Sequence, residues 1–423
     1  MQSVLDAIFR RLIVAGRLSV IWPDGSTSAY VGPPGSGPAA GLAIMDGATV
    51  RRLVLNPLLA FGEAYMAGTA KPAGCGLYEL LEVLMLNLDA NATGHPVARL
   101  RDRCGTLLRR IEQYNPAARA RRNVAHHYDL NGRLYSLFLD RDRQYSCAYF
   151  ATGGETLEAA QIAKKRHIAA KLMLDRPGLE VLDIGCGWGG LALTLGREYG
   201  ARVTGITLSQ EQLSEARARA AAEGLQDRVR FELIDYRAMS GTFDRIVSVG
   251  MFEHVGVGHY RTFFEAVSRL LRPKGVALIH YIGRTDGPGR TNPWISKYIF
   301  PGGYCPALSE VARPIEQAGL MATDIEVLRV HYAETIRHWR RRFAANRDAI
   351  ASLYDDRFCR MFEMYLVGSE LTFRHEWQAI DQIQLARRGS SLPITRDYMT
   401  ESERRREARE VAESQTGALN RSG

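Results

Sequence analysis

Residues 181–190, VLDIGCGWGG, decide the fold of this 423-residue chain. An apolar run ends at Ile184, and glycines follow at four of the next six positions. Glycines at such a point let the backbone turn sharply after a strand and approach a ligand closely. The segment therefore predicts a strand–loop–helix unit of an α/β sheet, with a ligand beyond the carboxyl end of the strand.

Strands and helices are predicted to alternate from this unit onward. Apolar runs at 179–185, 202–208, 229–235, 243–250 and 275–283 are typical of buried parallel strands, and residues 208–224 and 260–273 have helical spacing. This alternation predicts an α/β fold with a doubly wound, seven-stranded Rossmann-like sheet and helical additions. Beyond Tyr332 the pattern is mostly helical, and the charged stretch 401–414 is interpreted as a solvated helix or a frayed end.

The first 110 residues have a different pattern. Residues 17–31, RLSVIWPDGSTSAYV, predict a hairpin around the turn signal Pro23-Asp24-Gly25. Helical spacing follows at 59–68 and 77–88. We therefore expect a small α+β N-terminal accessory domain at 1–110 and a second domain at 111–423.

Composition narrows the possible partners and the compartment. The net charge of +9 is compatible with an anionic membrane surface, and no nucleic-acid-binding signature or zinc spacing is found, so neither nucleic acid nor a metal is expected. Six cysteines without a CxxC pair indicate a reducing cytoplasm. No apolar run reaches the roughly 18 residues of a membrane span. The expected location is therefore cytoplasmic, with peripheral association to the inner face of the membrane.

The glycine loop suits two classes of cofactor. Gly185, Gly187 and Gly190 form GxGxxG, the dinucleotide fingerprint, so a nicotinamide enzyme is the alternative for this motif. Asp183 precedes the glycines, and the resulting DxGxGxG closely resembles the pattern of class I S-adenosylmethionine methyltransferases.

An acid that commonly follows the second strand in both classes is absent here. Thr207, Ser209 and Gln212 occupy that region instead, and their hydroxyl and amide groups are able to form the hydrogen bonds of the missing carboxylate. This departure indicates a particular subfamily of methyltransferases.

Several longer segments, in order along the chain, make the resemblance specific. The chain resembles the cyclopropane-fatty-acyl-phospholipid synthase family, which includes the mycolic acid cyclopropane synthases. The matching segments are HYDL (127–130), YSCAYF (145–150), TLEAAQIAKK (156–165), LDIGCGWGGLA (182–192), GITLSQEQ (205–212), FDRIVSVGMFEHVG (243–256) and HYAETIRHW (331–339). FGEAYMAG (61–68) resembles the accessory domain of the longer bacterial members more loosely. The family usually has glycine and then asparagine after HYDL, so a local loop difference is expected there.

The resemblance implies transfer of a methylene group from S-adenosylmethionine to the cis double bond of unsaturated phospholipid acyl chains, which forms a cyclopropane ring. The implied base is a bound bicarbonate, held by Cys147, Glu253, His280, Ile282 and Tyr332. A fatty-acyl C-methyltransferase with a methyl-branched or methylene product is the nearest alternative. A small-molecule methyltransferase and a non-catalytic lipid-binding protein are the others. The structural alternative for His280 is a satisfied core histidine, and that for Tyr332 is the cap of a strand edge.

The resemblance also implies the cofactor contacts and partners. Asp183 and the glycine loop would approach the cofactor, with the remaining contacts divided among its parts: Tyr145 and Ser146 at the methionine end; Gly185, Cys186, Gly187 and Trp188 at its backbone; Thr207, Ser209 and Gln212 at the ribose; Tyr236 and Arg237 at the adenine. Phe150, Tyr281 and Trp294 are candidates for an acyl tunnel. The expected partners are unsaturated phospholipids at a membrane surface and a possible second copy in a homodimer, with membrane or dimer contacts supplied by the N-terminal domain.

Overall fold

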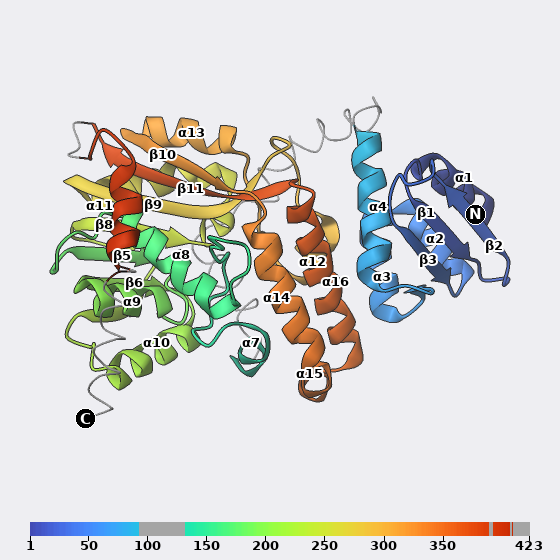
Figure 1. Ribbon diagram of the computed structural model, residues 1–423, viewed down its shortest axis with the longest axis horizontal. Coiled ribbons are helices and arrows are strands. Elements are labelled where there is room, and N and C mark those ends of the chain that lie inside the picture. Colours follow the sequence, from blue (N-terminus) through green and yellow to red (C-terminus); the bar gives the residue numbers. More distant parts are fainter. Residues whose placement is uncertain (93–131, 389–391, 407, 409–423) are drawn as a thin grey trace.

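The computed structural model describes residues 1–92, 132–388, 392–406 and 408 (Figure 1). The HYDL segment, Cys104 and half of the charged stretch 401–414 lie outside these residues.

A seven-stranded sheet in the order β10-β11-β9-β8-β5-β6-β7 forms the centre of the larger part (Figure 1). Its neighbours from β9 to β7 pair in parallel, whereas β11 is antiparallel to both of its neighbours. The predicted fold class is thereby confirmed. The strands are β5 (Glu180–Ile184), β6 (Arg202–Thr207), β7 (Val229–Leu233), β8 (Phe243–Val249), β9 (Leu271–Arg284), β10 (Leu320–Leu328) and β11 (Gln378–Arg387).

Helices cover both faces of this sheet because successive strand residues point to opposite sides. Val181 packs in a cluster with α8 (Leu157–Lys171), α9 (Gly190–Tyr199) and α10 (Gln210–Ala222). Its neighbour Leu182 packs in the opposite cluster, with α11 (Tyr260–Leu270) and α13 (Leu308–Gln317). Both faces are therefore apolar, as a doubly wound sheet requires.

Further helices pack over the carboxyl edge of the sheet. Phe138, Trp339 and Phe362 lie in one buried cluster and come from three of them. These additions are α7 (Gly132–Phe138), α12 (Pro293–Tyr298), α14 (His331–Ala345), α15 (Arg347–Leu353) and α16 (Asp356–Arg374), with short 3-10 turns at Tyr236–Ala238, Phe252–His254 and Val257–His259.

The expectation of mostly helical structure beyond Tyr332 is confirmed by α14, α15 and α16, but it did not include the strand β11. This strand lies between β9 and β10 in the sheet, yet it carries the buried polar residues Asp381, Gln382 and Gln384. Their partners come from distant parts of the chain: Gln382 meets His280, and Gln384 donates to the Lys171 carbonyl. A buried strand with polar residues inside it does not show the apolar run on which the prediction relied.

The described part of the charged tail is helical at 397–406 and docks on the sheet domain. Glu403 Oε1 lies 2.6 Å from His167 Nδ1, and Arg406 Nε lies 3.2 Å from Glu198 Oε2. Over this stretch the tail is thus a helix with exposed residues such as Glu401 and Arg405, and it is anchored by charged contacts on its other side.

Residues 1–92, called the N-terminal unit, have a separate four-stranded sheet in the order β2-β1-β3-β4 and their own apolar cluster. The predicted hairpin is confirmed, with Ile21 opposite Thr27. The elements are α1 (Gln2–Leu12), β1 (Arg17–Ile21), β2 (Thr27–Val31), β3 (Ala39–Ile44), α2 (Gly47–Leu55), α3 (Pro57–Ala67), β4 (Ala70–Pro72) and α4 (Leu77–Ala92). None of the helices in the described residues is long and apolar enough to cross a membrane.

The N-terminal unit packs through α3 and α4 against α12 and α16 (Figure 1). Glu63 Oε1 accepts hydrogen bonds from Lys297 Nζ at 2.7 Å and from the Tyr298 hydroxyl at 2.9 Å. The two parts approach each other closely at Gly62, where an added Cβ would lie 2.4 Å from Trp294 Cδ1. Only glycine leaves room for the indole ring at this point of α3.

We predict that Gly62→Ala destabilises the protein. The new methyl group has to displace the buried Trp294 ring, and overpacking of this kind costs about 1–3 kcal/mol. The matched control is Gly47→Ala at the start of α2, where an added Cβ meets nothing within 4 Å. Thermal unfolding followed by circular dichroism should show a lower Tm for Gly62→Ala and an unchanged or higher Tm for the control. Equal melting of both variants would contradict the close contact.

Candidate active site

The glycine loop turns the chain from β5 into α9 in a left-handed backbone conformation. Gly185, Gly187 and Gly189 have φ values of 83°, 55° and 84°. A Cβ at Gly189 would lie 2.7 Å from the Phe231 ring, whereas one at Gly187 would meet nothing within 4 Å. The space beside Gly187 is thus left open, as close approach of a ligand requires.

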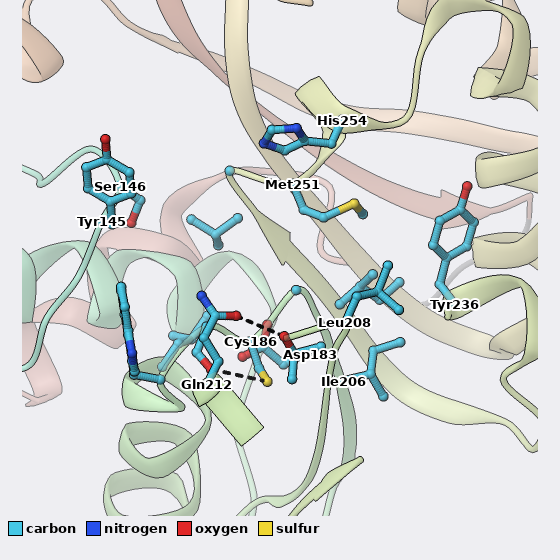
Figure 2. A pocket seen from close by; sticks show the side chains of 18 of the residues that line it. Tyr145, Ser146, Asp183, Cys186, Ile206, Leu208, Gln212, Tyr236, Met251 and His254 are labelled. Carbon is cyan, nitrogen blue, oxygen red and sulfur yellow. Dashed lines mark hydrogen bonds between the residues drawn. The ribbon is translucent and has the colours of Figure 1, made fainter. Parts of the chain in front are cut away.

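A cavity of about 150 Å³ lies at the carboxyl ends of β5, β6 and β8 (Figure 2). It is lined by eleven of the twelve predicted cofactor residues: Tyr145, Ser146, Asp183, Gly185, Cys186, Gly187, Trp188, Thr207, Gln212, Tyr236 and Arg237. Ser209 is the exception, because its hydroxyl caps α10 by accepting from the Gln212 backbone N–H.

Neutral side chains occupy the position at which a ribose-binding acid is missing. The buried Thr207 hydroxyl donates to Gln212 Oε1 at 2.9 Å, so the two side chains hold each other at the cavity wall. Across the cavity, Asp235 forms a two-pronged ion pair with Arg237, at 2.7 and 2.8 Å. The sequence reasoning missed Asp235, which lines the cavity and orients Arg237.

Asp183 carries a buried carboxylate at the floor of the cavity. Burial raises its pKa to about 7, and the Lys164 ammonium acts in the opposite direction. Its Oδ2 atom has no hydrogen-bond partner among the residues that the structure describes. A buried acceptor of this kind suits a ligand that brings a cationic N–H donor.

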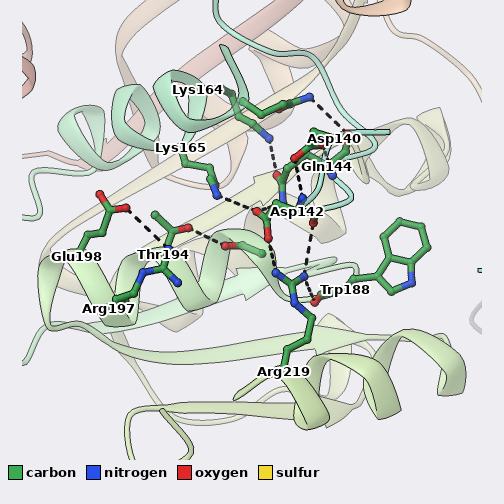
Figure 3. A network of polar contacts seen from close by, with 12 residues as sticks. Asp140, Asp142, Gln144, Lys164, Lys165, Trp188, Thr194, Arg197, Glu198 and Arg219 are labelled. Carbon is green, nitrogen blue, oxygen red and sulfur yellow. Dashed lines mark hydrogen bonds and ion pairs between the residues drawn. The ribbon is translucent and has the colours of Figure 1, made fainter. Parts of the chain in front are cut away.

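The segment before Cys147 is anchored between α8 and α10 (Figure 3). Asp142 forms ion pairs with Lys165, at 2.7 Å, and with Arg219. Arg219 also donates to the Trp188 carbonyl of the glycine loop at 2.8 Å. The glycine loop and the segment that faces it are therefore held at one fixed separation.

Lys164 is a residue that the sequence reasoning missed as a part of the site. Its side chain is 1% exposed, and its Nζ donates to Gln144 Oε1 at 2.6 Å and to Ser146 Oγ at 2.9 Å (Figure 3). Burial lowers its pKa to about 8. Gln161, one turn earlier on α8, donates to the Ser146 carbonyl at 2.9 Å. The signal in the sequence was the polar pair Gln161 and Lys164 in TLEAAQIAKK. Residues at i and i+3 share one helix face.

A second, larger cavity of about 630 Å³ meets the cofactor cavity at Tyr145 and Ser146, which line both. Its walls include all five residues predicted for the base: Cys147, Glu253, His280, Ile282 and Tyr332. His254 lines both cavities too, and burial lowers its pKa to about 4, so it is neutral at physiological pH.

Glu253 is held in place by the backbone of β9. Its Oε1 accepts from the Ile282 N–H at 2.7 Å, and its Oε2 is buried without a hydrogen-bond partner within residues 1–92, 132–388 and 392–406. Burial raises its pKa to about 7. The carboxyl group can therefore carry a proton near neutral pH and donate a hydrogen bond from Oε2.

The strand β11, which was not predicted from the sequence, orients His280. Gln382 stands opposite it on β11, and its Nε2 lies 3.1 Å from His280 Nδ1. With the Gln382 NH₂ group in this orientation as the donor, Nδ1 accepts, and a neutral ring then carries its proton on Nε2. That Nε2 has no hydrogen-bond partner in the described part of the chain, and burial holds the His280 pKa well below its usual range.

Cys147 and Tyr332 are both neutral. Burial raises the pKa of the Cys147 thiol, which donates to the Ala148 carbonyl at 3.2 Å. Burial likewise raises the pKa of the Tyr332 phenol on α14. A protonated thiol and a phenol are weak nucleophiles, so both groups can border a reactive species without attacking it.

Only one of the three aromatic tunnel candidates lines the larger cavity. Trp294 does, whereas Phe150 and Tyr281 do not among the lining residues of the described chain. Phe150 stacks on His338 at 5.8 Å, and Tyr281 packs against Phe252 in the cluster on the opposite sheet face. Side chains of neighbouring strand residues alternate between faces, so Tyr281 points away from the side of His280 and Ile282.

The sheet order, the glycine turn and the cofactor cavity define an S-adenosylmethionine-dependent methyltransferase. Two solved structures agree with this assignment. The cyclopropane synthase MmaA2 from Mycobacterium tuberculosis matches with a TM-score of 0.61 and 31% identity, over 65% of this chain and 99% of that chain. The mycolic acid cyclopropane synthase CmaA1 complexed with SAH and CTAB matches with a TM-score of 0.60 and 32% identity, over 64% and 99%.

The family model of mycolic acid cyclopropane synthetase matches residues 116–383, and the chain belongs to this family, together with the cyclopropane-fatty-acyl-phospholipid synthases. The synthase of that name from Escherichia coli (strain K12) is 39% identical over 81% of this chain and 90% of its own length. A probable fatty acid methyltransferase from Pseudomonas putida is 40% identical over 65% and 73%. Tuberculostearic acid methyltransferase UfaA1 from M. tuberculosis is 35% identical over 92% of both chains.

We predict that Gly187→Ala weakens cofactor binding without unfolding the protein. The methyl group enters the space that the cofactor approaches, so affinity for S-adenosylhomocysteine should fall by roughly tenfold or more, as expected when a close backbone contact is lost. Gly178→Ala is the matched control, because Gly178 has a similar left-handed φ of 79°, has open space and does not line the cavity. Isothermal titration calorimetry measures both affinities. Equal affinities in the two variants would rule out cofactor approach at Gly187.

Proposed function

We propose that this enzyme transfers a methylene group from S-adenosylmethionine to the cis double bond of an unsaturated phospholipid acyl chain and closes a cyclopropane ring, with bicarbonate as the base. The observation that carries the proposal is the meeting of the five predicted residues in one largely apolar cavity that joins the cofactor cavity. The names of the Escherichia coli relative and of the mycobacterial synthases support this choice of reaction.

The residues of the smaller cavity fit the cofactor. S-adenosylmethionine supplies an electrophilic methyl group when it is bound. Asp183 Oδ2 would accept from its ammonium group, and Tyr236 and Arg237 would flank its adenine. Tyr145 and Ser146 would hold the methionine end at the junction of the two cavities, where the methyl group has to face the acyl chain.

The larger cavity offers the polar groups that a small oxyanion needs. When bound, bicarbonate supplies a base. It is too weak a nucleophile to trap the cation that methyl transfer leaves on the acyl chain. Glu253 Oε2 and His280 Nε2 are buried without partners among the described residues, and both can donate when Glu253 is protonated. Ile282 contributes by orienting Glu253 with its N–H, and the thiol of Cys147 and the phenol of Tyr332 complete the wall.

The remaining work of the protein is positioning and the exclusion of water. An isolated alkene is a weak nucleophile, so the acyl chain has to be held against the methyl donor in a dry cavity. Methyl transfer leaves a cation on the chain, and ring closure removes a proton from the new methyl group. The neutral Cys147 and Tyr332 border this cation without forming a bond to it.

The N-terminal unit is proposed to bring the enzyme to its substrate as a peripheral contact with the membrane, or with a second copy of the chain. Exposed basic side chains, among them Arg10, Arg11 and Arg51, would favour anionic lipid headgroups. The synthase named for phospholipids aligns over 357 residues and thus reaches into this unit, whereas cyclopropane mycolic acid synthase 3 aligns over 276 residues that make up 96% of its length. The unit is thus shared by longer relatives, and UfaA1, which aligns over 399 residues, is another of them.

The second candidate function is C-methylation of the acyl chain without ring closure. The relatives named as fatty acid and tuberculostearic acid methyltransferases favour it, since both are at least 35% identical to this chain. The two functions share methyl transfer and differ in the fate of the cation.

Product analysis separates the two functions. The purified enzyme is incubated with S-adenosylmethionine, bicarbonate and vesicles of monounsaturated phospholipid, and the fatty acid methyl esters are examined by gas chromatography–mass spectrometry before and after catalytic hydrogenation. We expect a product heavier by one methylene group that resists mild hydrogenation. A product of that mass that takes up hydrogen, or one already saturated and branched, would overturn ring closure. No product at all with bound cofactor would overturn the acyl substrate.

The affinity for bicarbonate should weaken as the pH rises through the Glu253 titration. Below its pKa of about 7 the carboxyl group donates to the anion, and above it the carboxylate repels the anion. Between pH 6.5 and 8.5 we expect the bicarbonate concentration for half-maximal activity to rise by about tenfold or more in the wild type. Lys164 adds to the rise only near its own pKa of about 8.

Glu253→Gln is the matched variant for this experiment. Its amide can still accept from the Ile282 N–H and donate from the other atom, but it does not titrate. Its bicarbonate requirement should stay level up to about pH 7.5 and rise only as Lys164 loses its proton. Rates are measured in carbon-dioxide-depleted buffers at defined bicarbonate concentrations. A wild-type profile that coincides with that of Glu253→Gln would show that this carboxyl group does not control anion binding.

A further inference from the structure

The larger cavity does not end at the reaction centre but continues into the N-terminal unit. Side chains from α1, α2, α3 and α4 line this extension, among them Ile8, Leu12, Leu58 and Leu84. Every lining residue that the described N-terminal unit contributes is apolar. The extension is thus a groove suited to a hydrocarbon chain, and none of the proposed chemistry needs it.

Polar side chains line the cavity between this groove and the reaction centre. The loop from the end of β9 to the start of α12 contributes two arginines, one acid and two neutral polar residues to the wall: Arg284, Arg290, Asp286, Thr291 and Asn292. Arg284 follows Ile282 by two residues at the reaction centre, and α12 packs on α3 of the N-terminal unit, so the loop runs from one compartment to the other. Arg284 is fixed by Asp286 and by the Arg290 carbonyl, at 2.9 and 3.2 Å.

The loop therefore lies between two parts of the cavity that can take hydrocarbon: the apolar groove, and the reaction centre, whose polar groups stand beside apolar walls such as Ile336 and Phe373. A diacyl phospholipid has a matching order, with two chains that diverge from a glycerol ester and phosphate region. A single fatty acyl chain would place methylene groups beside the arginine side chains and would leave one apolar compartment unexplained. Burial of apolar surface favours filling both compartments with hydrocarbon.

We propose that the groove of the N-terminal unit binds the second, non-reacting acyl chain of the same phospholipid whose unsaturated chain lies at Glu253 and His280. The inference rests on the proposed function, because it specifies the substrate of that site. It makes the diacyl form the preferred substrate: the saturated chain lies along α1, α3 and α4, and the glycerol and phosphate region lies at the Arg284–Asn292 loop.

The test compares two substrates in the same nonionic detergent micelles. One is a phospholipid with one saturated and one monounsaturated chain, and the other is the lysophospholipid that keeps only the monounsaturated chain. The groove variant is Ile8→Glu with Leu58→Glu, since these side chains line the cavity and are 41% and 43% exposed, which lets the protein fold with charges there. The control is Val4→Glu with Leu55→Glu, at 47% and 73% exposed positions that do not line it.

We expect the wild type and the control to have a higher kcat/KM for the diacyl substrate, and the groove variant to lose about fivefold or more of that preference, because a charge opposes burial of the second chain. Equal kcat/KM for both substrates in the wild type would overturn the inference. So would an equal loss in the control, which would assign the effect to the micelle surface, or an equal loss on both substrates in the groove variant. Absence of cyclopropane product from either substrate would instead count against the proposed function.

Photo-crosslinking gives a readout that does not depend on turnover. A phospholipid with a diazirine on its saturated chain is bound to the full-length protein with S-adenosylhomocysteine, irradiated and digested for mass spectrometry. We expect labelled peptides from α1, α3 or α4, and weaker labelling there in the groove variant. Labels confined to peptides of the catalytic residues would overturn the inference, even if the enzyme makes cyclopropanes.

Discussion

The arrangement of the two cavities depends on the hydrogen bonds of the buried Lys164 ammonium group. It binds the side chains of Gln144 and Ser146, and Ser146 lines both the cofactor cavity and the larger one. A lysine that is 1% exposed loses most of its hydration, so its hydrogen bonds to the protein have to replace it. Those bonds fix the short segment at which a charged, water-loving cofactor and an apolar chain have to meet.

The same removal of water sets the charge state of the reaction centre. Burial raises the pKa of both Asp183 and Glu253 to about 7 and lowers that of His280 well below its usual range. Near neutral pH the two carboxyl groups are therefore only partly ionised, and His280 is neutral. A charged ligand then meets few competing charges in the site, and its electrostatic interactions are stronger in such a dry site than in water. This explains how carboxyl groups can be buried here at an affordable cost in stability.

The sequence contains the fold and most of the site because both are encoded by local patterns. The apolar run before Gly185 and the alternation of strands and helices predicted the parallel part of the sheet, which the structure confirms. The resemblance supplied Glu253 and His280, but no local pattern revealed that Gln382 on β11 sets the tautomer of His280. Long-range partners of buried polar groups are set by strand order. Strand order cannot be read from the period of apolar residues.

Ser209 and Tyr281 show the same limit at single positions. Ser209 lies in the expected motif, yet its hydroxyl caps the N-terminus of α10, as a serine at that position commonly does. Tyr281 lies between His280 and Ile282 in the chain, but strand alternation turns it to the other face of the sheet. A motif locates a segment, and the backbone period then decides which of its side chains reach the ligand.

The division of labour between the two parts of the chain follows from where titratable groups lie. All the ionisable side chains at the reaction centre come from residues 132–388, whereas the described N-terminal unit adds only apolar walls to the larger cavity. A wall of this kind cannot transfer a proton or stabilise a charge, but it can select a hydrocarbon shape. The Glu63 contacts with Lys297 and Tyr298 hold that wall beside α12, next to the polar loop. On the proposed function, chemistry and choice of substrate are carried by different segments, and the packing of α3 and α4 on α12 and α16 brings their walls together in one cavity.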